Sequence, residues 1–222
     1  MSASTHRATV YVVDDDPTVR ILLQATLEQK NIQVEAYDCA EKFLLAYQPD
    51  MPGCLLLDVL MPGMSGLELQ QLLAGQGSEI PIIFLSGASE VGIAVDALKA
   101  GAVDFIEKPV QPNRVLDCVE SAMKLDVERR HRRSRIAEIE LRKQLLTRRE
   151  EEVMGWIVKD KSSKQIARLL GISSRTVETH RSRVMEKMQA RSLIDLAEML
   201  MSESLDSPTT YNYVSLHTQT YD

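Results

Sequence analysis

The feature that most constrains the fold is a regular alternation of short apolar runs with longer amphipathic stretches, between Thr9 and about Val127. Each run has the length of a buried strand, and each stretch between runs is long enough for a helix. Five such units in succession predict a parallel sheet with helices on both faces, because right-handed crossovers place them there. We therefore expect a doubly wound α/β fold, with strands at 9–13, 33–37, 54–57, 80–85 and 103–106.

Local signals mark where several helices begin. Pro17 directly follows Asp16, and proline is favoured at the first helical position because its missing N–H would have no partner there. Three further starts carry a capping box, in which an acid three residues past the cap bonds back to it. Gly101 is expected to end the fourth helix. The three boxes are Asp38 with Glu41, Ser65 with Glu68, and Thr147 with Glu150.

The C-terminal part is predicted to be helical. Residues 124–146 contain neither Gly nor Pro, so the fifth helix is expected to continue through them as a linker. Further helices are expected from Thr147 to about Lys159 and over 163–170, 174–188 and 192–201. The second and third of these flank a turn at Gly171, which is the layout of a helix-turn-helix. The expected domains are an α/β domain at 1–123, a helical linker at 124–146, an all-α four-helix domain at 147–201 and a loosely held tail at 202–222.

The composition excludes several other classes of protein. With 44% hydrophobic and 26% charged residues, the chain is typical of a globular protein rather than a disordered one. Its apolar runs are far shorter than the roughly 18 residues of a membrane span, and residues 1–9 lack the apolar core of a secretory signal. The 3 cysteines are odd in number and have no metal-binding spacing, which fits free thiols in a reducing compartment. We therefore expect a cytoplasmic protein without a membrane partner.

The net charge of −6 is divided unevenly along the chain. Residues 1–123 carry 7 Lys and Arg against 17 Asp and Glu, whereas residues 124–201 carry 19 against 12. A basic region attracts polyanions such as DNA, because its phosphate contacts release bound counterions. The same excess also fits an ordinary solvated surface, and charge alone does not separate the two interpretations.

Acidic, hydroxyl and basic side chains follow four of the five predicted strands. In a doubly wound sheet, ligands bind outside the carboxyl ends of the strands, so these side chains are expected to converge. Carboxylates that meet there need a cation, and an all-oxygen cluster suits Mg²⁺. A carboxylate beside Mg²⁺ can attack a phosphoryl group, while a lysine and a hydroxyl stabilise the transferred oxygens. The residues are Asp14, Asp15 and Asp16 after the first strand, Asp58 after the third, Ser86 after the fourth and Lys108 after the fifth.

Four segments resemble the receiver domains of two-component response regulators in their order and spacing: VVDDDPTVR, LLLDVLMPGMSG, FLSGAS and FIEKPV. The resemblance covers Thr9 to about Leu125 and implies a flavodoxin-like fold. It implies that Asp58 accepts a phosphoryl group from a sensor histidine kinase. It also implies a Mg²⁺ site formed by Asp14, Asp15, Asp58 and the backbone carbonyl of Leu60.

The same resemblance assigns a switch. Lys108 would pair with the phosphate, Ser86 would hydrogen-bond it, and Phe105 would turn inward as the switch closes. The Lys108–Pro109 peptide bond would be cis. Asp16 is most simply a helix cap, with a role beside the metal as the alternative.

Other interpretations of the acidic site stay open. Asp58 alone could cap a strand end, Lys108 could be a surface lysine, and Phe105 an ordinary core aromatic. A phosphatase with an aspartate nucleophile would also place an acid after an apolar strand, but it would need a second acid where Leu60 stands. A regulator that acts without phosphorylation, with the acidic site as a relic, is a third interpretation.

The segment from about Leu146 to Met201 resembles the LuxR-type helix-turn-helix output domain, and the two domains together resemble a response regulator of the FixJ/NarL type. That family is a phospho-accepting transcription regulator rather than an enzyme, and the resemblance implies double-stranded DNA as a partner and a homodimer when phosphorylated. His180 could equally be structural, and Glu186 is most simply a solvated partner of a nearby base. The residues expected to contact phosphates are Lys164, Arg175, Thr176, His180 and Lys187, and those expected to contact base edges are Glu178, Thr179, Ser182 and Arg183.

Overall fold

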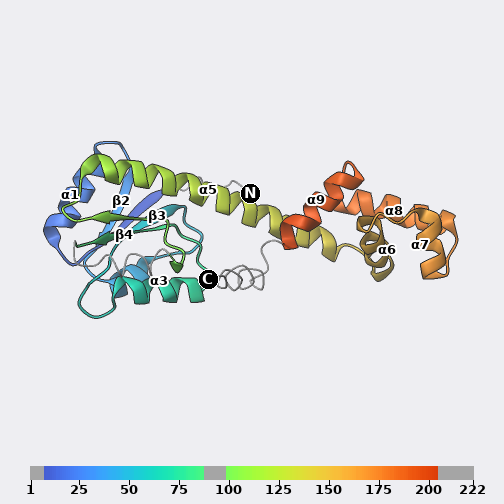
Figure 1. Ribbon diagram of the computed structural model, residues 1–222, viewed down its shortest axis with the longest axis horizontal. Helices are drawn as coiled ribbons and strands as arrows, with labels where there is room; N and C mark the ends of the chain where they lie inside the picture. Colours follow the sequence, from blue (N-terminus) through green and yellow to red (C-terminus); the bar gives the residue numbers. More distant parts are fainter. Residues whose placement is uncertain (1–7, 88–98, 205–222) are drawn as a thin grey trace, which may run out of the picture. The chain divides into compact units, whose positions relative to one another are not determined.

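The computed structural model describes residues 8–87 and 99–204. Contacts divide the chain into two compact units, with the boundary between His131 and Arg132. One unit is an α/β sheet structure and the other is helical (Figure 1). Among the helices described, none is both long enough and apolar enough to cross a membrane.

The α/β unit is built on a parallel sheet of five strands in the order β2-β1-β3-β4-β5. Val13 lies in register with both Tyr37 and Leu57, and Ser86 lies in register with Glu107, so the carboxyl ends of the strands share one edge. The strands are β1 (Thr9–Val13), β2 (Gln33–Tyr37), β3 (Gly53–Asp58), β4 (Ile82–Ser86) and β5 (Asp104–Glu107).

Helices cover both faces of this sheet. Helices α1 (Pro17–Glu28) and α5 (Pro112–Gln144) lie on one side, and α3 (Gly66–Gly75) lies on the other (Figure 1). The central strands are buried on both faces, so alternate residues feed two cores. Val12 and Leu56 pack with the first pair of helices, whereas Val13 and Leu57 pack with α3 and with α2 (Ala40–Ala46). The doubly wound fold expected from the sequence is confirmed.

Two of the predicted capping boxes are present and one is wrong. Ser65 with Glu68 and Thr147 with Glu150 each make both reciprocal bonds. Helix α2 instead begins after Cys39, which makes no side-chain cap bond.

The two acids of the failed box have other partners. Asp38 pairs with Lys42 Nζ at 2.6 Å, and Glu41 Oε1 accepts the backbone N–H of Met64 at 3.2 Å. At the start of α1, Asp16 acts as the predicted cap, because its Oδ1 accepts the Thr18 N–H at 2.8 Å. Most of the predicted fourth helix lies outside the described residues, and Gly101 after it has a φ of 98°.

The helical unit contains the predicted helix-turn-helix. Helix α5 continues without a break to Gln144, and its Ile139 packs into the core of the four following helices. Gly171 has a φ of 66° between α7 and α8, and the Ser173 hydroxyl caps α8 by accepting the Thr176 N–H at 3.0 Å. The predicted tail lies outside the described residues from 205 onward. The helices are α6 (Arg148–Val158), α7 (Ser163–Leu170), α8 (Ser174–Met188) and α9 (Leu193–Ser204).

Candidate functional site

Three carboxylates meet at the carboxyl edge of the sheet. Asp14 and Asp15 follow β1, and Asp58 ends the neighbouring β3. One oxygen from each lies within 4.8 Å of the other two. Asp14 is fully buried and Asp58 is 5% exposed, whereas Asp15 faces solvent. The convergence predicted from the strand ends is therefore present in the fold.

Lys108 brings a positive charge to this cluster from β5. Its Nζ lies 2.8 Å from Asp14 Oδ2 and 2.9 Å from Asp58 Oδ2. The backbone N–H of Lys108 donates to the carbonyl of Ser86 at 2.8 Å, and the Lys108–Pro109 bond is cis, as expected. One ammonium thus bridges the two most buried carboxylates.

Burial and charge shift the titration of this pair. Burial, together with the charge of Asp14, raises the pKa of the Asp58 carboxyl to about 6, although the hydrogen bond from Lys108 lowers it. Burial lowers the pKa of the Lys108 ammonium, but its bonds to Asp14 and Asp58 outweigh burial and leave that pKa raised. The cluster therefore holds more negative charge than Lys108 alone neutralises.

The residues present fit a divalent cation. Asp14 Oδ2 is buried and accepts no well-aligned hydrogen bond from the described part of the chain, although the Lys108 ammonium lies beside it as an ion pair. Two more carboxylates, one of them open to solvent, lie within reach of the same point. A hard cation with oxygen ligands and bound water suits this donor set. Asp14, Asp15 and Asp58 are the side chains able to hold it.

The loop after β3 approaches the site closely. Leu60 is 54% exposed, so its side chain points away from the buried cluster and only its backbone is available to a ligand. Gly66 N–H donates to the carbonyl of Val59 at 3.0 Å, and a Cβ on Gly66 would lie 2.1 Å from the Asp58 carbonyl oxygen. Glycine is therefore required where α3 begins.

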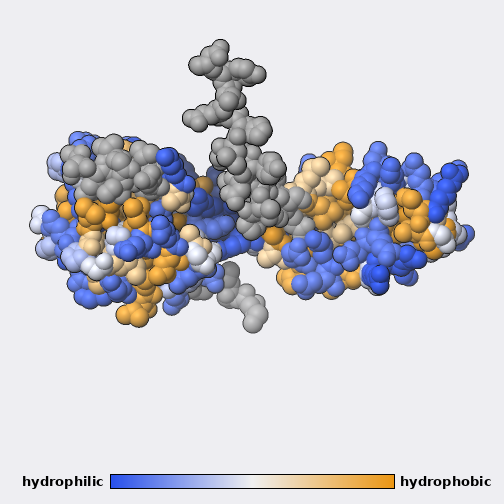
Figure 2. Space-filling view, turned by 60° about the horizontal axis from the view of Figure 1, so that its bottom comes forward, coloured by the Kyte–Doolittle hydropathy of each residue, from blue (hydrophilic) through white to orange (hydrophobic). Residues whose placement is uncertain are grey.

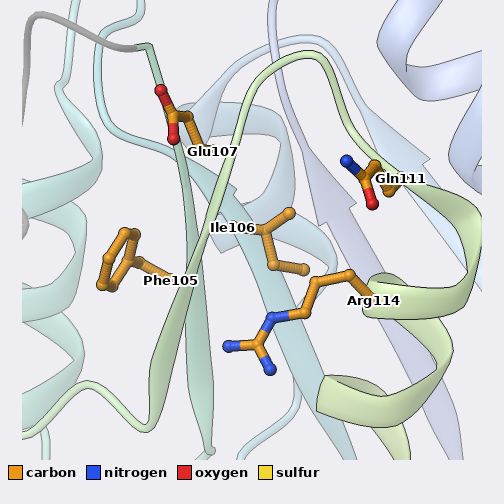
Figure 3. Close-up of a pocket in the computed structure, with 5 residues that line it drawn as sticks. All are labelled: Phe105, Ile106, Glu107, Gln111 and Arg114. Carbon is orange, nitrogen blue, oxygen red and sulfur yellow. The ribbon is translucent and has the colours of Figure 1, made fainter.

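The other two expected switch residues, besides Lys108, lie on neighbouring strands. Ser86 is buried at the end of β4, and Phe105, on β5, is 37% exposed. Figure 3 shows Phe105 on the opposite side of β5 from Ile106 and Arg114. All three line a 320 Å³ pocket together with Glu107 and Gln111. Phe105 thus stands at the surface in this structure.

Arg20 is a site residue that the sequence reasoning missed. Its guanidinium, on α1, donates to the backbone carbonyl of Asp14 at 2.6 Å, while Asp14 Oδ1 accepts the Asp16 N–H at 2.9 Å. These bonds fix the loop that carries Asp14 and Asp15. The available signal was the arginine that ends the segment VVDDDPTVR.

In the helical unit, α8 separates a packed face from an open one. Val177, Val184 and Met188 are fully buried. The opposite side carries polar residues, and Figure 2 shows hydrophilic surface over much of this unit. A helix with such a face can enter the major groove of DNA. The exposed residues among the expected DNA contacts are Arg175, Thr176, Glu178, Thr179, Ser182 and Arg183 on α8, and Lys164 on α7.

A concavity lies beside the start of α8. It has a volume of 490 Å³ and is lined by Lys164 and Arg168 of α7 and by Ser173 and Ser174 at the start of α8. Two basic side chains beside a helix N-terminus attract a phosphate group. The place suits the DNA backbone next to the groove.

Two of the expected DNA contacts have other surroundings. Lys187 Nζ lies 2.6 Å from Glu150 Oε2, so its charge is already paired within the unit. His180 is half-buried, and its Nδ1 has no hydrogen-bond partner among the described residues. The remaining expected contacts form the more open surface.

Comparisons with known proteins agree with both halves of this description. Residues 10–120 match the response regulator receiver domain, and residues 144–200 match the luxR family of bacterial regulatory proteins. The chain is 40% identical to nodulation protein W of Bradyrhizobium diazoefficiens, over 91% of this chain and 88% of that protein. It is 38% identical to the transcriptional regulatory protein FixJ of the same organism, over 89% of this chain and 96% of FixJ.

A solved structure extends the likeness to the fold. The response regulator StyR has a TM-score of 0.76 and 40% sequence identity, and the match covers 88% of this chain and 98% of StyR. The acidic edge of the sheet, the helix-turn-helix and these relatives lead to one assignment. The chain belongs to the two-component response regulators of the FixJ/NarL type, in which a receiver domain and a LuxR-type DNA-binding domain together control transcription.

Proposed function

We propose that Asp58 is the phosphoryl acceptor of this regulator and that a sensor histidine kinase is the donor. The observation that carries the proposal is the bridge from Lys108 Nζ to both Asp58, at 2.9 Å, and Asp14, at 2.8 Å. The Asp58 carboxylate therefore lies beside the Lys108 ammonium and beside the carboxylates of Asp14 and Asp15. An Asp58 oxygen forms a bond to phosphorus while the bond from phosphorus to the kinase histidine breaks and the imidazole leaves.

Each residue of the acidic site has a separate role in the proposed phosphoryl transfer. Asp14, Asp15, Asp58 and the Leu60 carbonyl would hold Mg²⁺, which supplies positive charge to the transferring oxygens when bound. Lys108 stabilises the phosphoryl oxygens from the side of β5. Ser86 donates its hydroxyl to the phosphoryl group, and Phe105 turns inward from its exposed position. Burial of the site keeps these charges effective.

Intact mass tests the acceptor. Full-length protein is incubated with acetyl phosphate and Mg²⁺, and we expect a mass gain of one phosphoryl group. The Asp58→Asn variant is expected to show none. Asp16→Asn is the matched control, since Asp16 lies in the same edge as a helix cap and Asn keeps the capping oxygen. A gain that persists in Asp58→Asn contradicts the assignment, whereas a gain lost in Asp16→Asn assigns Asp16 the alternative role beside the metal.

We further propose that phosphorylation controls binding to double-stranded DNA by a homodimer. The dimer forms through β5, which Figure 3 shows, and through the expected fourth helix, most of which lies outside the described residues. Lys164, Arg175, Thr176, His180 and Lys187 contact phosphates, and Glu178, Thr179, Ser182 and Arg183 read base edges. We also propose that the receiver domain ends at residue 123, the helical linker at 146 and the DNA-binding domain at 201. Analytical ultracentrifugation with and without acetyl phosphate tests the dimer, because an unchanged sedimentation coefficient contradicts it.

Catalytic turnover separates this role from a phosphatase. Leu60 stands where a phosphatase would place its second acid, two residues after Asp58, and it is a solvent-exposed leucine. We therefore propose a phospho-accepting regulator that is not an enzyme. Release of many phosphates per protein from a phosphate ester would overturn this part.

A further inference from the structure

A second group of charged side chains, with one buried carboxylate and two partly exposed arginines, lies at the amino edge of the sheet, away from the acidic site. Asp126 of α5 is 3% exposed. Its Oδ2 accepts the backbone N–H of Gly53 at 2.9 Å and the Nε–H of Arg130 at 2.8 Å. Gly53 begins β3, the strand that ends at Asp58. A buried carboxylate is costly unless it is paired, and this one is paired from two elements.

Arg130 extends the contact to the loop before β3. Its two terminal nitrogens donate to the backbone carbonyls of Asp50, at 2.8 Å, and of Met51. Next to it, Arg129 donates to the carbonyl of Glu79, before β4, at 2.7 Å. A planar guanidinium reaches a carboxylate and two carbonyls at once, which a lysine ammonium on its flexible stem does not reproduce.

These contacts lie where α5 leaves the receiver. The helix is packed in the receiver core as far as Met123, and the boundary between the units follows His131. Residues 131–135 are exposed, so packing there does little to hold the helix. Exposed helical hydrogen bonds open at low cost unless side chains anchor them. Asp126, Arg129 and Arg130 supply that anchor.

We propose that Asp126, Arg129 and Arg130 form a latch that keeps the linker part of α5 attached to the receiver, and that regulation of DNA binding by phosphorylation requires this latch. A receiver influences an attached output domain through an element whose conformational equilibrium both domains bias. Helix α5 is continuous from Pro112 to Gln144 and belongs to both units. With the latch open, the linker helix no longer follows the receiver, and the signal is lost.

Hydrogen exchange of the full-length protein tests the latch itself. We expect Arg130→Met to speed amide exchange in residues 124–131 by at least about tenfold, because hydrogen bonds to charged groups are lost. Lys124→Met is the matched control: it breaks an i,i+4 ion pair on the same helix, between Lys124 and Glu120 at 2.6 Å, whose side chains are 71% and 69% exposed. Equal exchange in the two variants overturns the latch. An equal rise in β1 and β3 overturns it as well, because that is global destabilisation.

The second part of the proposal, that regulation of DNA binding requires the latch, rests on the proposed function and is tested by a separate measurement. The dissociation constant for operator DNA is measured with and without phosphorylation, and intact mass verifies equal phosphorylation in every variant. We expect the ratio of the two constants to fall by about fivefold or more in Arg130→Met and to persist in Lys124→Met. A wild-type ratio in Arg130→Met overturns the regulatory role. A ratio of one in the wild type contradicts the proposed function, and the exchange experiment then still decides whether the latch exists.

Two conservative variants keep the test valid if Arg130→Met folds poorly. Arg130→Lys retains the positive charge without the planar guanidinium. Asp126→Asn retains an oxygen that accepts the Gly53 N–H but removes the negative charge. Both are expected to raise exchange in residues 124–131 to rates between those of wild type and Arg130→Met. Wild-type exchange in both overturns the proposal.

Discussion

Lys187 Nζ lies 2.6 Å from Glu150 Oε2 and joins the last turn of α8 to the first turn of α6. Glu150 is 1% exposed, and the same oxygen accepts the backbone N–H of Thr147 at 2.8 Å. One carboxylate therefore closes the start of a helix and also holds the helix that is expected to read DNA. The hydrogen bond from Lys187, with that from Thr147, holds the pKa of Glu150 at about 2.

Glu150→Gln is expected to lower the free energy of unfolding of the helical unit by about 2 kcal/mol at pH 7. Because the pKa of Glu150 is lowered from 4.5 to about 2 on folding, its stabilisation is present above pH 4.5 and is lost as the pH falls through about 2. The difference between variant and wild type should therefore shrink across that window. Urea denaturation followed by the fluorescence of Trp156, the one tryptophan of the chain, measures it.

Glu152→Gln is the control for this prediction. Glu152 lies on the same helix and pairs with Arg149 and Arg148, and its side chain is 35% exposed against 2% for that of Glu150. Exposed pairs contribute little, so we expect a change below about 0.5 kcal/mol. Equal losses in the two variants would show that the buried pair with Lys187 adds nothing.

Asp58→Asn is expected to stabilise the receiver at neutral pH in the absence of Mg²⁺. Folding raises the pKa of Asp58 from 3.8 to about 6, so the ionised carboxylate destabilises the fold and stability falls as the pH rises through 6. We expect a gain of about 1–3 kcal/mol at pH 7.5 and almost none at pH 3.5. Urea denaturation followed by circular dichroism at both pH values checks this. A gain of the same size at pH 3.5 would assign the effect to packing rather than to charge.

Much of the acidic site could be predicted from the sequence, because its residues directly follow the ends of strands. The apolar runs fixed where β1, β3 and β5 stop, and the carboxyl ends of parallel strands must share an edge. Asp14, Asp58 and Lys108 therefore meet, although 94 residues of chain separate the first from the last. The helix-turn-helix was also predictable from local signals, since Gly171 separates two segments in which apolar residues recur with a helical period.

Two of the misses share one physical cause, which is a partner far away in the chain, whereas the missed Arg20 finds its partner, the Asp14 carbonyl, 6 residues away. Asp38 and Glu41 have the spacing of a capping box, but Glu41 finds Met64, 23 residues later, and the helix starts without it. Asp126 and Arg130 have the spacing of an ordinary surface ion pair, and nothing local indicates that Asp126 is buried against Gly53, 73 residues earlier. Short-range patterns predict helices and strands, whereas such contacts depend on the packed fold.

Gly66→Ala is expected to impair the acidic site, and Gly75→Ala on the same helix is not. A Cβ at Gly66 would lie 2.1 Å from the Asp58 carbonyl oxygen and 3.1 Å from the Leu57 side chain, so backbone must move. We expect a loss of about 1–3 kcal/mol and slower phosphorylation by acetyl phosphate, measured by intact mass over time. At Gly75 nothing lies within 4 Å, so alanine should stabilise α3 by about 0.5–1 kcal/mol. Unchanged phosphorylation in Gly66→Ala would contradict the close approach.

Lys164→Gln and Arg183→Gln are expected to weaken DNA binding in different ways. Lys164 lines the basic concavity beside α8, so its loss should weaken binding to all DNA sequences and lower the salt dependence of log K by about 1. Arg183 is exposed on the open face of α8, so its loss should cost about 1–3 kcal/mol on the operator and little on unrelated DNA. Fluorescence anisotropy at several salt concentrations measures both effects. Lys124→Gln, which removes the same charge from α5, should change neither quantity. If Arg183→Gln weakens operator and unrelated DNA equally, Arg183 contacts the backbone and not a base.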